Sequence, residues 1–142
     1  MNYTIEVVTL AVRDTGRALD FYTRLAGFTL DVDYHPDDRY RVVQLTPPGS
    51  ACSIQFGTGL TDAAPGSARA THLVVTDIEA AHRELGDRGL PVGPLRRKTT
   101  VEDWQGDHSP GTDPGRRDYA SSFTFADPDG NTWVVQERGH SR

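Results

Sequence analysis

The strongest constraint on how this chain folds is an internal repeat of a strand, a turn and a strand. In residues 123–137, β-branched and aromatic residues flank a turn that contains proline and glycine. Proline fixes φ and glycine supplies the positive φ of a tight reversal, so this segment is predicted to be a β-hairpin. Residues 42–56 have the same arrangement, with Gly49 in the place of Gly130, an offset of 81 residues.

The segments in front of the two hairpins also correspond, at a different offset. Residues 8–14 resemble residues 71–77. The residues that recur 63 positions later are Leu10/Leu73, Val12/Val75, Asp14/Asp77 and Ala18/Ala81. Subtracting 63 from 81 leaves 18 additional residues in the second copy. The pattern therefore predicts two copies of a unit made of a strand, a helix and further strands, the second with an insertion.

Each copy carries the signals of a helix. Asp14 and Asp77 are predicted N-caps. The apolar stripes are Ala18, Phe21, Tyr22 and Leu25 in the first copy, and Ile78, Ala81, His82 and Leu85 in the second. Gly27 is predicted to end the first helix. Strands are predicted at residues 5–12 and 28–34, with a turn at residues 35–38.

The 142 residues are predicted to form a single domain over residues 1–142. Module 1 is expected at about 5–57, a linker at about 58–69, and module 2 at about 70–138. The segment at about 92–118 is expected to be a long loop, and loops of this length are usually functional or disordered. The basic runs at residues 96–98 and 116–117 are interpreted as solvated loop charges.

Composition excludes several classes of partner. The net charge of −5 argues against nucleic acid and anionic membranes, because both require a basic face. The single cysteine, Cys52, excludes an internal disulfide and is expected to be buried and inert. No apolar run approaches the length of a membrane helix or a signal sequence. We therefore expect a cytoplasmic protein.

Taken together, these motifs resemble the vicinal oxygen chelate superfamily of glyoxalases, extradiol dioxygenases and bleomycin-resistance proteins. The residues that carry the resemblance are 10–14, 17–22, 25–28 and 127–131. The resemblance implies an α+β fold with two βαβββ modules that form a curved mixed sheet, with helices on the outer face. Such a sheet forms a cup that holds a ligand or a metal. It also implies a homodimer.

The metal enzymes of that superfamily have a His seven residues before the helix-capping Asp of each module. This rule falls on Val7 and Ala70, neither of which binds metal. The expected cofactor is therefore none, with a divalent metal in an atypical site as the alternative.

The superfamily's metal enzymes also have a Glu on a late strand of each module. The corresponding positions are Ser53 and Val134, or Gln55 and Gln136 two residues further along. Glu137 has the opposite strand parity and is predicted to face away from the cup. No carboxylate is therefore expected at the late-strand positions.

His72 is the histidine closest to the expected metal position. It lies two residues beyond Ala70, on the same face of the strand but about 6–7 Å further along. Three roles remain open for it: a metal ligand, a ligand-contacting or acid/base catalytic residue, and a structural histidine. His35 and His108 are expected in loops, and His82 and His140 are expected to face solvent.

Two functions compete. The first is metal-independent binding of a small hydrophobic or aromatic molecule, as in the bleomycin-resistance members that confer antibiotic resistance. The predicted lining is Val7, Thr9, Ala11, Ser53, Gln55, Ala70, His72, Val134 and Gln136, with Tyr34, Tyr40, Trp104 and Tyr119 available for stacking. The second is a glyoxalase-like lyase or isomerase, or a dioxygenase, with an atypical metal site or with His72 as acid or base. A structural or regulatory role is a third reading.

Overall fold

The computed structural model describes residues 1–99 and 107–141, which divide into two compact units. Unit 1 consists of Met1–Arg69 and Asp127–Asn131, and unit 2 consists of Ala70–Ala126 and Thr132–Arg142. The turn between the last two strands therefore belongs to unit 1, although both strands belong to unit 2.

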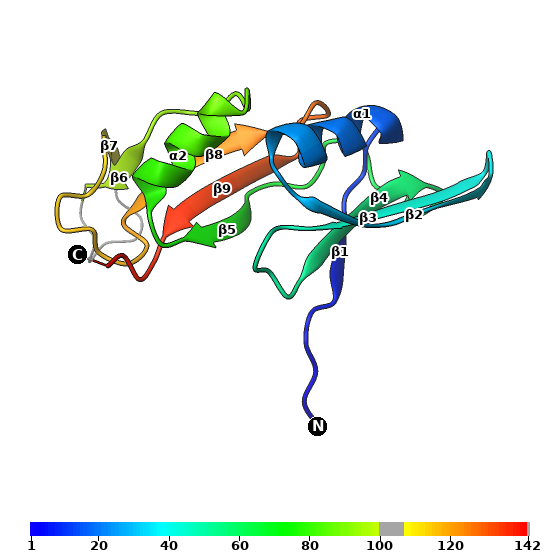
Figure 1. Cartoon of the computed structure of the whole chain (residues 1–142), viewed down its shortest axis with the longest axis horizontal. Helices are drawn as coiled ribbons and strands as arrows, with labels where there is room; N and C mark the ends of the chain where they lie inside the picture. Colours follow the sequence, from blue (N-terminus) through cyan, green and yellow to red (C-terminus); the bar gives the residue numbers. More distant parts are fainter. Residues whose placement is uncertain (100–106, 142) are drawn as a thin grey trace. The chain divides into compact units, whose positions relative to one another are not determined.

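Unit 1 contains one mixed sheet of four strands (Figure 1). Its elements are β1 (Val7–Thr9), α1 (Thr15–Asp20), the π-helical segment η1 (Phe21–Leu25), β2 (Thr29–Asp37), β3 (Tyr40–Thr46) and β4 (Ser53–Thr58). The strand order is β1-β4-β3-β2, with β1 parallel to β4 and the other neighbours antiparallel.

Unit 2 contains one mixed sheet of five strands (Figure 1). Its elements are β5 (Thr71–Val75), α2 (Ile78–Asp87), β6 (Arg96–Lys98), β7 (His108–Pro110), β8 (Ser121–Ala126) and β9 (Thr132–Glu137). The order is β5-β9-β8-β6-β7, with β5 parallel to β9 and the other neighbours antiparallel.

The two sheets have the same topology, which confirms the predicted α+β fold with two βαβββ modules. Strands β1, β4, β3 and β2 correspond in order to β5, β9, β8 and β6, and β7 is an additional edge strand. The segment at 92–118, expected to be a loop, therefore contains two short strands. They form because Arg96 and Arg97 pair with Ser122 and Ser121 along the edge of β8.

The helical segment of unit 1 begins and ends where the sequence predicts. The Asp14 carboxylate caps α1 by accepting from the Arg17 N–H at 3.1 Å. Gly27 follows η1 with a φ of 78°, a left-handed conformation that favours glycine. Tyr22 is fully buried, and its ring lies 5.7 Å from that of Phe56 on β4. Burial of this apolar stripe against one face of the sheet forms the core of unit 1.

The turn at Asp127–Asn131 is a hydrogen-bonded part of unit 1. The Asp127 carboxylate accepts from the Tyr22 hydroxyl at 2.8 Å and from the backbone N–H of Asn131 at 3.0 Å. The Asn131 amide donates to the Ala11 carbonyl at 3.0 Å. Asp127 and Asn131 are both buried, so these bonds offset the cost of removing their polar groups from water.

The core of unit 2 lies between α2 and its sheet. Asp77 caps α2 by accepting from the Ala80 N–H at 3.0 Å, as predicted. Ile78 on the helix and Phe123 on β8 are fully buried. The stacked rings of Phe125 and Trp133 lie 5.8 Å apart and extend the same layer.

Several local predictions are wrong. The first strand covers Val7–Thr9 rather than 5–12, and residues 1–6 are exposed. The β2 strand continues through Pro36 to Asp37, with a register shift between Tyr34 and Asp37. An edge strand tolerates proline because the backbone N–H groups on its outer side have no partner strand to donate to. Cys52 precedes β4 and is half-buried rather than in the core. None of the helices in the described part of the chain is long and apolar enough to cross a membrane.

Candidate functional site

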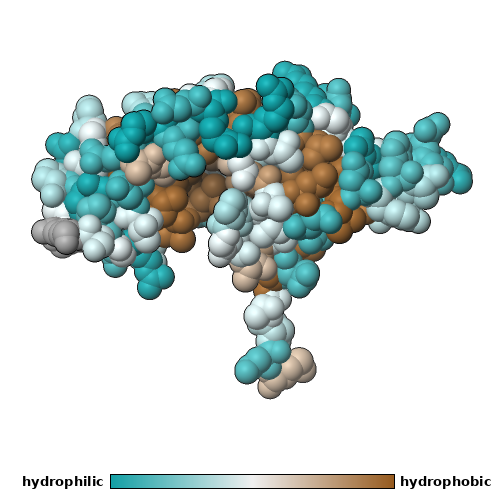
Figure 2. All heavy atoms as spheres, in the orientation of Figure 1, coloured by the Kyte–Doolittle hydropathy of each residue, from teal (hydrophilic) through white to brown (hydrophobic). Residues whose placement is uncertain are grey.

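The sheet of unit 2 has one face against α2 and one open face. Because side chains alternate along a strand, Phe123, Phe125, Trp133 and Val135 point to the helix and their neighbours point the other way. The strand register aligns His72 with Val134, Val134 with Thr124, and Gln136 with Ser122. Figure 2 shows hydrophobic surface over the part of unit 2 that contains β5 and β9.

A pocket of about 520 Å³ lies at the turn end of this sheet. It is lined by Ala70, Pro91, Gly93, Arg96, Thr124, Phe125, Ala126, Thr132, Trp133 and Val134. The backbone N–H of Gly93 donates to the Thr124 carbonyl at 2.8 Å, which holds the segment before β6 against β8. The volume of the pocket is in the range of small-molecule binding sites.

The pocket lining is neutral and largely apolar, apart from Arg96. The Arg96 Nε donates to the Ser122 hydroxyl at 3.2 Å, and both residues lie on β strands whose pairing is fixed by the sheet. The arginine was predicted to be a solvated loop charge, but it is half-buried. Its guanidinium therefore brings a charge to an otherwise uncharged cavity.

Of the predicted lining residues in unit 2, the pocket includes Ala70 and Val134. Gln136 and His72 lie on the same open face, outside the pocket lining. His72 is exposed, and its Nδ1 lies 2.6 Å from the Ala70 carbonyl oxygen. Ala70 itself has a left-handed φ of 56°, which is uncommon for a residue with a Cβ.

The predicted residues of unit 1 gather on the open face of its own sheet. Val7 pairs with Ser53, and Thr9 pairs with Gln55, whose Nε2 donates to the Thr9 hydroxyl at 2.9 Å. Further along this sheet, the rings of Tyr34 and Tyr40 lie 6.2 Å apart in an edge-to-face arrangement. This face thus combines hydroxyl and amide groups with two exposed aromatic rings.

Three predicted site residues have other surroundings. Ala11 is buried beyond the end of β1, and its carbonyl accepts from Gly66 and Asn131. Tyr119 has a φ of 64°, and the Arg138 guanidinium lies 5.8 Å from its ring centroid. Trp104 falls outside the described residues.

The positions at which the resemblance would place metal ligands do not fit a divalent cation. Val7, Ala70 and Val134 have no donor atom in their side chains, and Gln55 and Gln136 offer neutral amides. In the described part of the chain, His72 belongs to no group of three His, Cys, Asp or Glu side chains with metal-ligand spacing. The donor set is therefore unlike the His and carboxylate ligands that such metals require.

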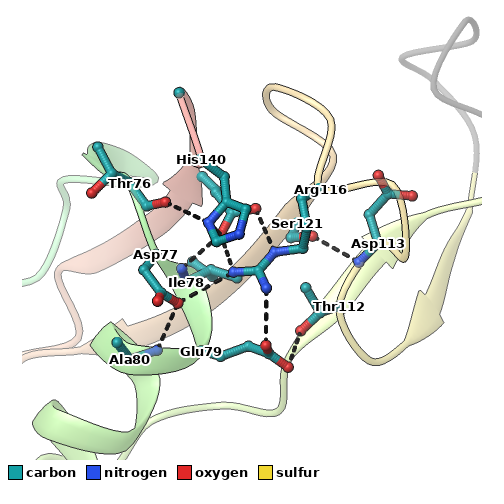
Figure 3. A network of polar contacts seen from close by, with 12 residues as sticks. Thr76, Asp77, Ile78, Glu79, Ala80, Thr112, Asp113, Arg116, Ser121 and His140 are labelled. Carbon is teal, nitrogen blue, oxygen red and sulfur yellow. Dashed lines mark hydrogen bonds and ion pairs between the residues drawn. The ribbon is translucent and has the colours of Figure 1, made fainter. Parts of the chain in front are cut away.

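An ionic network around the buried Glu137 lies on the opposite, helix-facing side of unit 2 (Figure 3). The Arg116 Nη2 lies 2.7 Å from Oε2 of the fully buried Glu137, and its Nη1 lies 3.0 Å from Oε1 of Glu79. Asp77 is 3.2 Å away. The backbone N–H of Ile78 also donates to Glu137 at 2.8 Å. Arg116, predicted to be a solvated loop charge, is therefore a structural residue.

The network shifts the pKa values of its members. Burial raises the pKa of Glu137, but hydrogen bonds from Arg116 and from the Ile78 N–H outweigh it, and the net shift is downward. The Ala80 N–H and Arg116 lower the pKa of Asp77. The pKa of Arg116 is raised, first by its hydrogen bond to Glu137. All three groups are thus held in their charged forms.

Within the described residues, one His/Cys/Asp/Glu group has metal-binding spacing, and it belongs to this network. The ligand atoms of Asp77, Glu137 and His140 lie within 4.8 Å of one another. Arg116 contacts both carboxylates, however, and His140 Nδ1 lies 3.0 Å from the Thr76 carbonyl oxygen. The arginine already supplies the positive charge that a cation would bring.

Two histidines expected to face solvent are part of the packing. The His140 side chain is 16% exposed. His82 Nε2 lies 2.8 Å from the Gly93 carbonyl oxygen, and its ring meets that of Phe123 at 4.9 Å. His82 therefore connects α2 to the segment that borders the pocket.

The model of the glyoxalase/bleomycin resistance protein/dioxygenase superfamily matches residues 4–135. The chain belongs to this superfamily. The match covers both modules and agrees with the repeated topology.

Solved structures provide similar chains from two bacteria. TnmS3, an antibiotic binding protein from Streptomyces sp. CB03234, is 26% identical with a TM-score of 0.70, and the alignment covers 96% of each chain. A superfamily member from Sphaerobacter thermophilus DSM 20745 is 26% identical with a TM-score of 0.69, over 96% of this chain and 98% of the other. A search of curated proteins found no match.

Among the pocket residues that sequence reasoning missed are Arg96, Pro91, Gly93 and Thr124. Thr124 has the same strand parity as Val134 and Gln136, and this signal could have identified it. The other three precede or begin β6, whose pairing with β8 depends on the length and path of the insertion. No local pattern reveals that pairing.

Proposed function

We propose that this protein binds a small hydrophobic or aromatic molecule, without a metal, in the pocket of unit 2. Binding of this kind would sequester the molecule, as in the bleomycin-resistance type. The observation that carries the proposal is the 520 Å³ pocket with a neutral lining and a single charged residue among the described residues that form it.

The chemistry of the lining supports an uncharged, flat ligand body. Ala70, Pro91, Ala126 and Val134 present apolar groups, so a ligand that covers them removes apolar surface from water. Thr124 and Thr132 offer hydroxyl groups at the sides of the same space. A few polar groups in an apolar cavity orient a ligand.

The comparisons support a small-molecule ligand. TnmS3 is described as an antibiotic binding protein, and it aligns with nearly the whole of this chain. At 26% identity, this similarity supports binding of a small molecule and leaves the compound open. This similarity supports the proposed role as a binding protein for an antibiotic-like compound.

A matched pair of tryptophan variants tests the proposal. Ala126→Trp adds an indole inside the pocket, at an exposed position where no buried contact is lost. Val74→Trp adds the same group on the same sheet, at a residue that is 57% exposed and outside the pocket lining. The ligands are planar aromatic antibiotics, and the neutral fluorescent probe N-phenyl-1-naphthylamine.

Thermal shift and fluorescence titration provide the readouts. At least one compound should raise the Tm of the wild type and of Val74→Trp, because a ligand bound to the folded state stabilises it. The same compound should bind Ala126→Trp at least tenfold more weakly. Equal binding to both variants, or no protection by any compound, would refute the proposed function.

We also propose a homodimer that uses the β2–β3 hairpin. This hairpin exposes Leu30, Val32, Tyr34 and Tyr40, each 39–56% exposed, and such clusters of apolar side chains favour association. Light scattering should give about twice the 15.6 kDa chain mass for the wild type and a monomer for Val32→Asp. A monomeric wild type would contradict this arrangement.

A further inference from the structure

One end of the open face of unit 2 is basic. Strand β6 aligns Arg96 with Ser122 on β8 and with Pro110 on β7, and it aligns Lys98 with His108. Residues aligned in this way share a face of the sheet. Three nitrogen-bearing side chains, those of Arg96, Lys98 and His108, are therefore on the open face, next to a lining that is otherwise neutral.

Arg96 differs from the half-buried Arg41 and Arg116 in its partners. The half-buried Arg97 also donates to a neutral group, the Pro110 carbonyl, but it does not line the pocket. Arg41 lies 2.8 Å from the Asp33 carboxylate, and Arg116 lies 2.7 Å from that of Glu137. Arg96 donates to the neutral hydroxyl of Ser122. No carboxylate in the described ranges 1–99 and 107–141 lies within ion-pair distance of it.

This arrangement has a cost that a ligand can offset. A partly buried guanidinium has lost water, and one neutral hydroxyl replaces only a part of that hydration. A guanidinium has five N–H donors, and Ser122 uses one of them. The remaining donors suit two oxygen atoms of an oxyanion, which a guanidinium binds in a bidentate manner.

We infer that Arg96 binds an oxyanion of the pocket's ligand, so that the ligand is an aromatic compound with an acidic group. This inference rests on the proposed function and adds to it that the ligand carries a negative charge. The aromatic body would lie on Val134, Ala126 and Ala70, and the acidic group would lie at the β6 side of the pocket.

The surroundings of His108 support a positive potential at this side of the sheet. Burial is the largest cause that lowers the pKa of His108, followed by the charges of Arg96 and Lys98, while Asp107 acts in the opposite direction. Burial also lowers the pKa of Lys98. An anion close to Arg96 would reduce the repulsion among these groups.

Two fluorescent probes with the same aromatic skeleton separate the charge from the aromatic body. They are 8-anilinonaphthalene-1-sulfonate, which carries an anionic sulfonate, and N-phenyl-1-naphthylamine, which lacks it. The dissociation constant of each probe is measured for the wild type and for Arg96→Gln. The control is Arg83→Gln, which makes the same charge change at an exposed position on α2.

Arg96→Gln should weaken binding of the sulfonate about tenfold, the loss typical of one charge-assisted hydrogen-bonded contact. Binding of the neutral probe should change less than twofold, and Arg83→Gln should affect neither probe. Equal effects of Arg96→Gln on both probes, or no effect on either, would overturn the inference while leaving the proposed function intact. If neither probe bound the wild type, the inference and the proposed function would both fail for this class of aromatic ligand.

Discussion

Arg116 and Arg96 belong to the same unit, lie near opposite faces of the same sheet, and have opposite electrostatic surroundings. Arg116 has three carboxylates within 3.2 Å, one of them fully buried. Arg96 donates to a serine hydroxyl and lines an open pocket. The sequence offers no hint of this difference, because both residues stand in short basic runs.

The difference separates a structural charge from a charge that is available to a ligand. A buried ion pair with complete hydrogen bonding is strongly destabilised when one partner is removed, because the other charge stays buried. A charge without an internal counterion contributes little to folding and can contribute to binding instead. The helix-facing side of unit 2 should therefore govern stability, and the open face should govern ligand affinity.

The largest effect is expected for Arg116→Met. This change leaves Glu137 buried without its counterion, and it should lower the free energy of unfolding by about 3–5 kcal/mol. Urea denaturation followed by circular dichroism measures the loss. Adding Glu137→Gln should recover part of it, because the double variant has no buried charge at this position. A loss below about 1 kcal/mol in Arg116→Met would mean that the network is not structural.

A smaller loss is expected for Asn131→Ala in unit 1. The Asn131 side chain donates to Ala11 and Asp127 and accepts from the Ala68 N–H at 3.0 Å. Removing a buried partner of this kind costs about 1–3 kcal/mol. The same denaturation experiment measures it. An unchanged midpoint would show that water satisfies these groups in the variant.

The pH dependence of stability should follow Glu137. The folded-state pKa of this group lies below its ordinary value of 4.5, so the group stabilises the folded state above pH 4.5. This contribution is lost as the pH falls below 4.5 through the depressed pKa. Denaturation midpoints between pH 3 and 6 should show a shallower slope for Glu137→Gln than for the wild type. Equal slopes would contradict the proposed charge state.

The smallest effect on stability is expected for Arg96→Met. In the wild type, Arg96 donates a hydrogen bond to the Ser122 hydroxyl at the edge of an open pocket. Loss of this bond should alter the free energy of unfolding by no more than about 0.5 kcal/mol. Denaturation in parallel with Arg116→Met provides the direct comparison. A loss similar to that of Arg116→Met would remove the distinction between the two arginines.

The repeated topology and the helix caps could be predicted from the sequence because their signals are local. Asp14 and Asp77 have the same place before their helices, and Gly49 and Gly130 have a positive φ in their turns. The alternation of side chains along β4 and β9 also predicted which residues face the core and which lie on the open faces. These features depend on backbone conformation and on strand periodicity, which a single segment encodes.

The β6 side of the pocket and the ionic network could not be predicted, because they depend on the insertion. Arg116 approaches Glu137 through a turn in which its own φ is 50°, and nothing in the flanking residues indicates this conformation. Arg96 enters the sheet only because β6 aligns with the edge of β8. Long-range register of this kind is set by packing between segments and not by the residues of one segment.

The proposed binding pocket is tested most directly by NMR. The ¹⁵N-labelled protein is titrated with N-phenyl-1-naphthylamine, and shifts of the backbone amides report where the probe binds. We predict that the largest shifts cluster at Thr124, Ala126, Thr132 and Val134, and that they disappear in Ala126→Trp. Shifts centred on the β2–β3 hairpin, or shifts that persist unchanged in Ala126→Trp, would contradict a ligand site in unit 2.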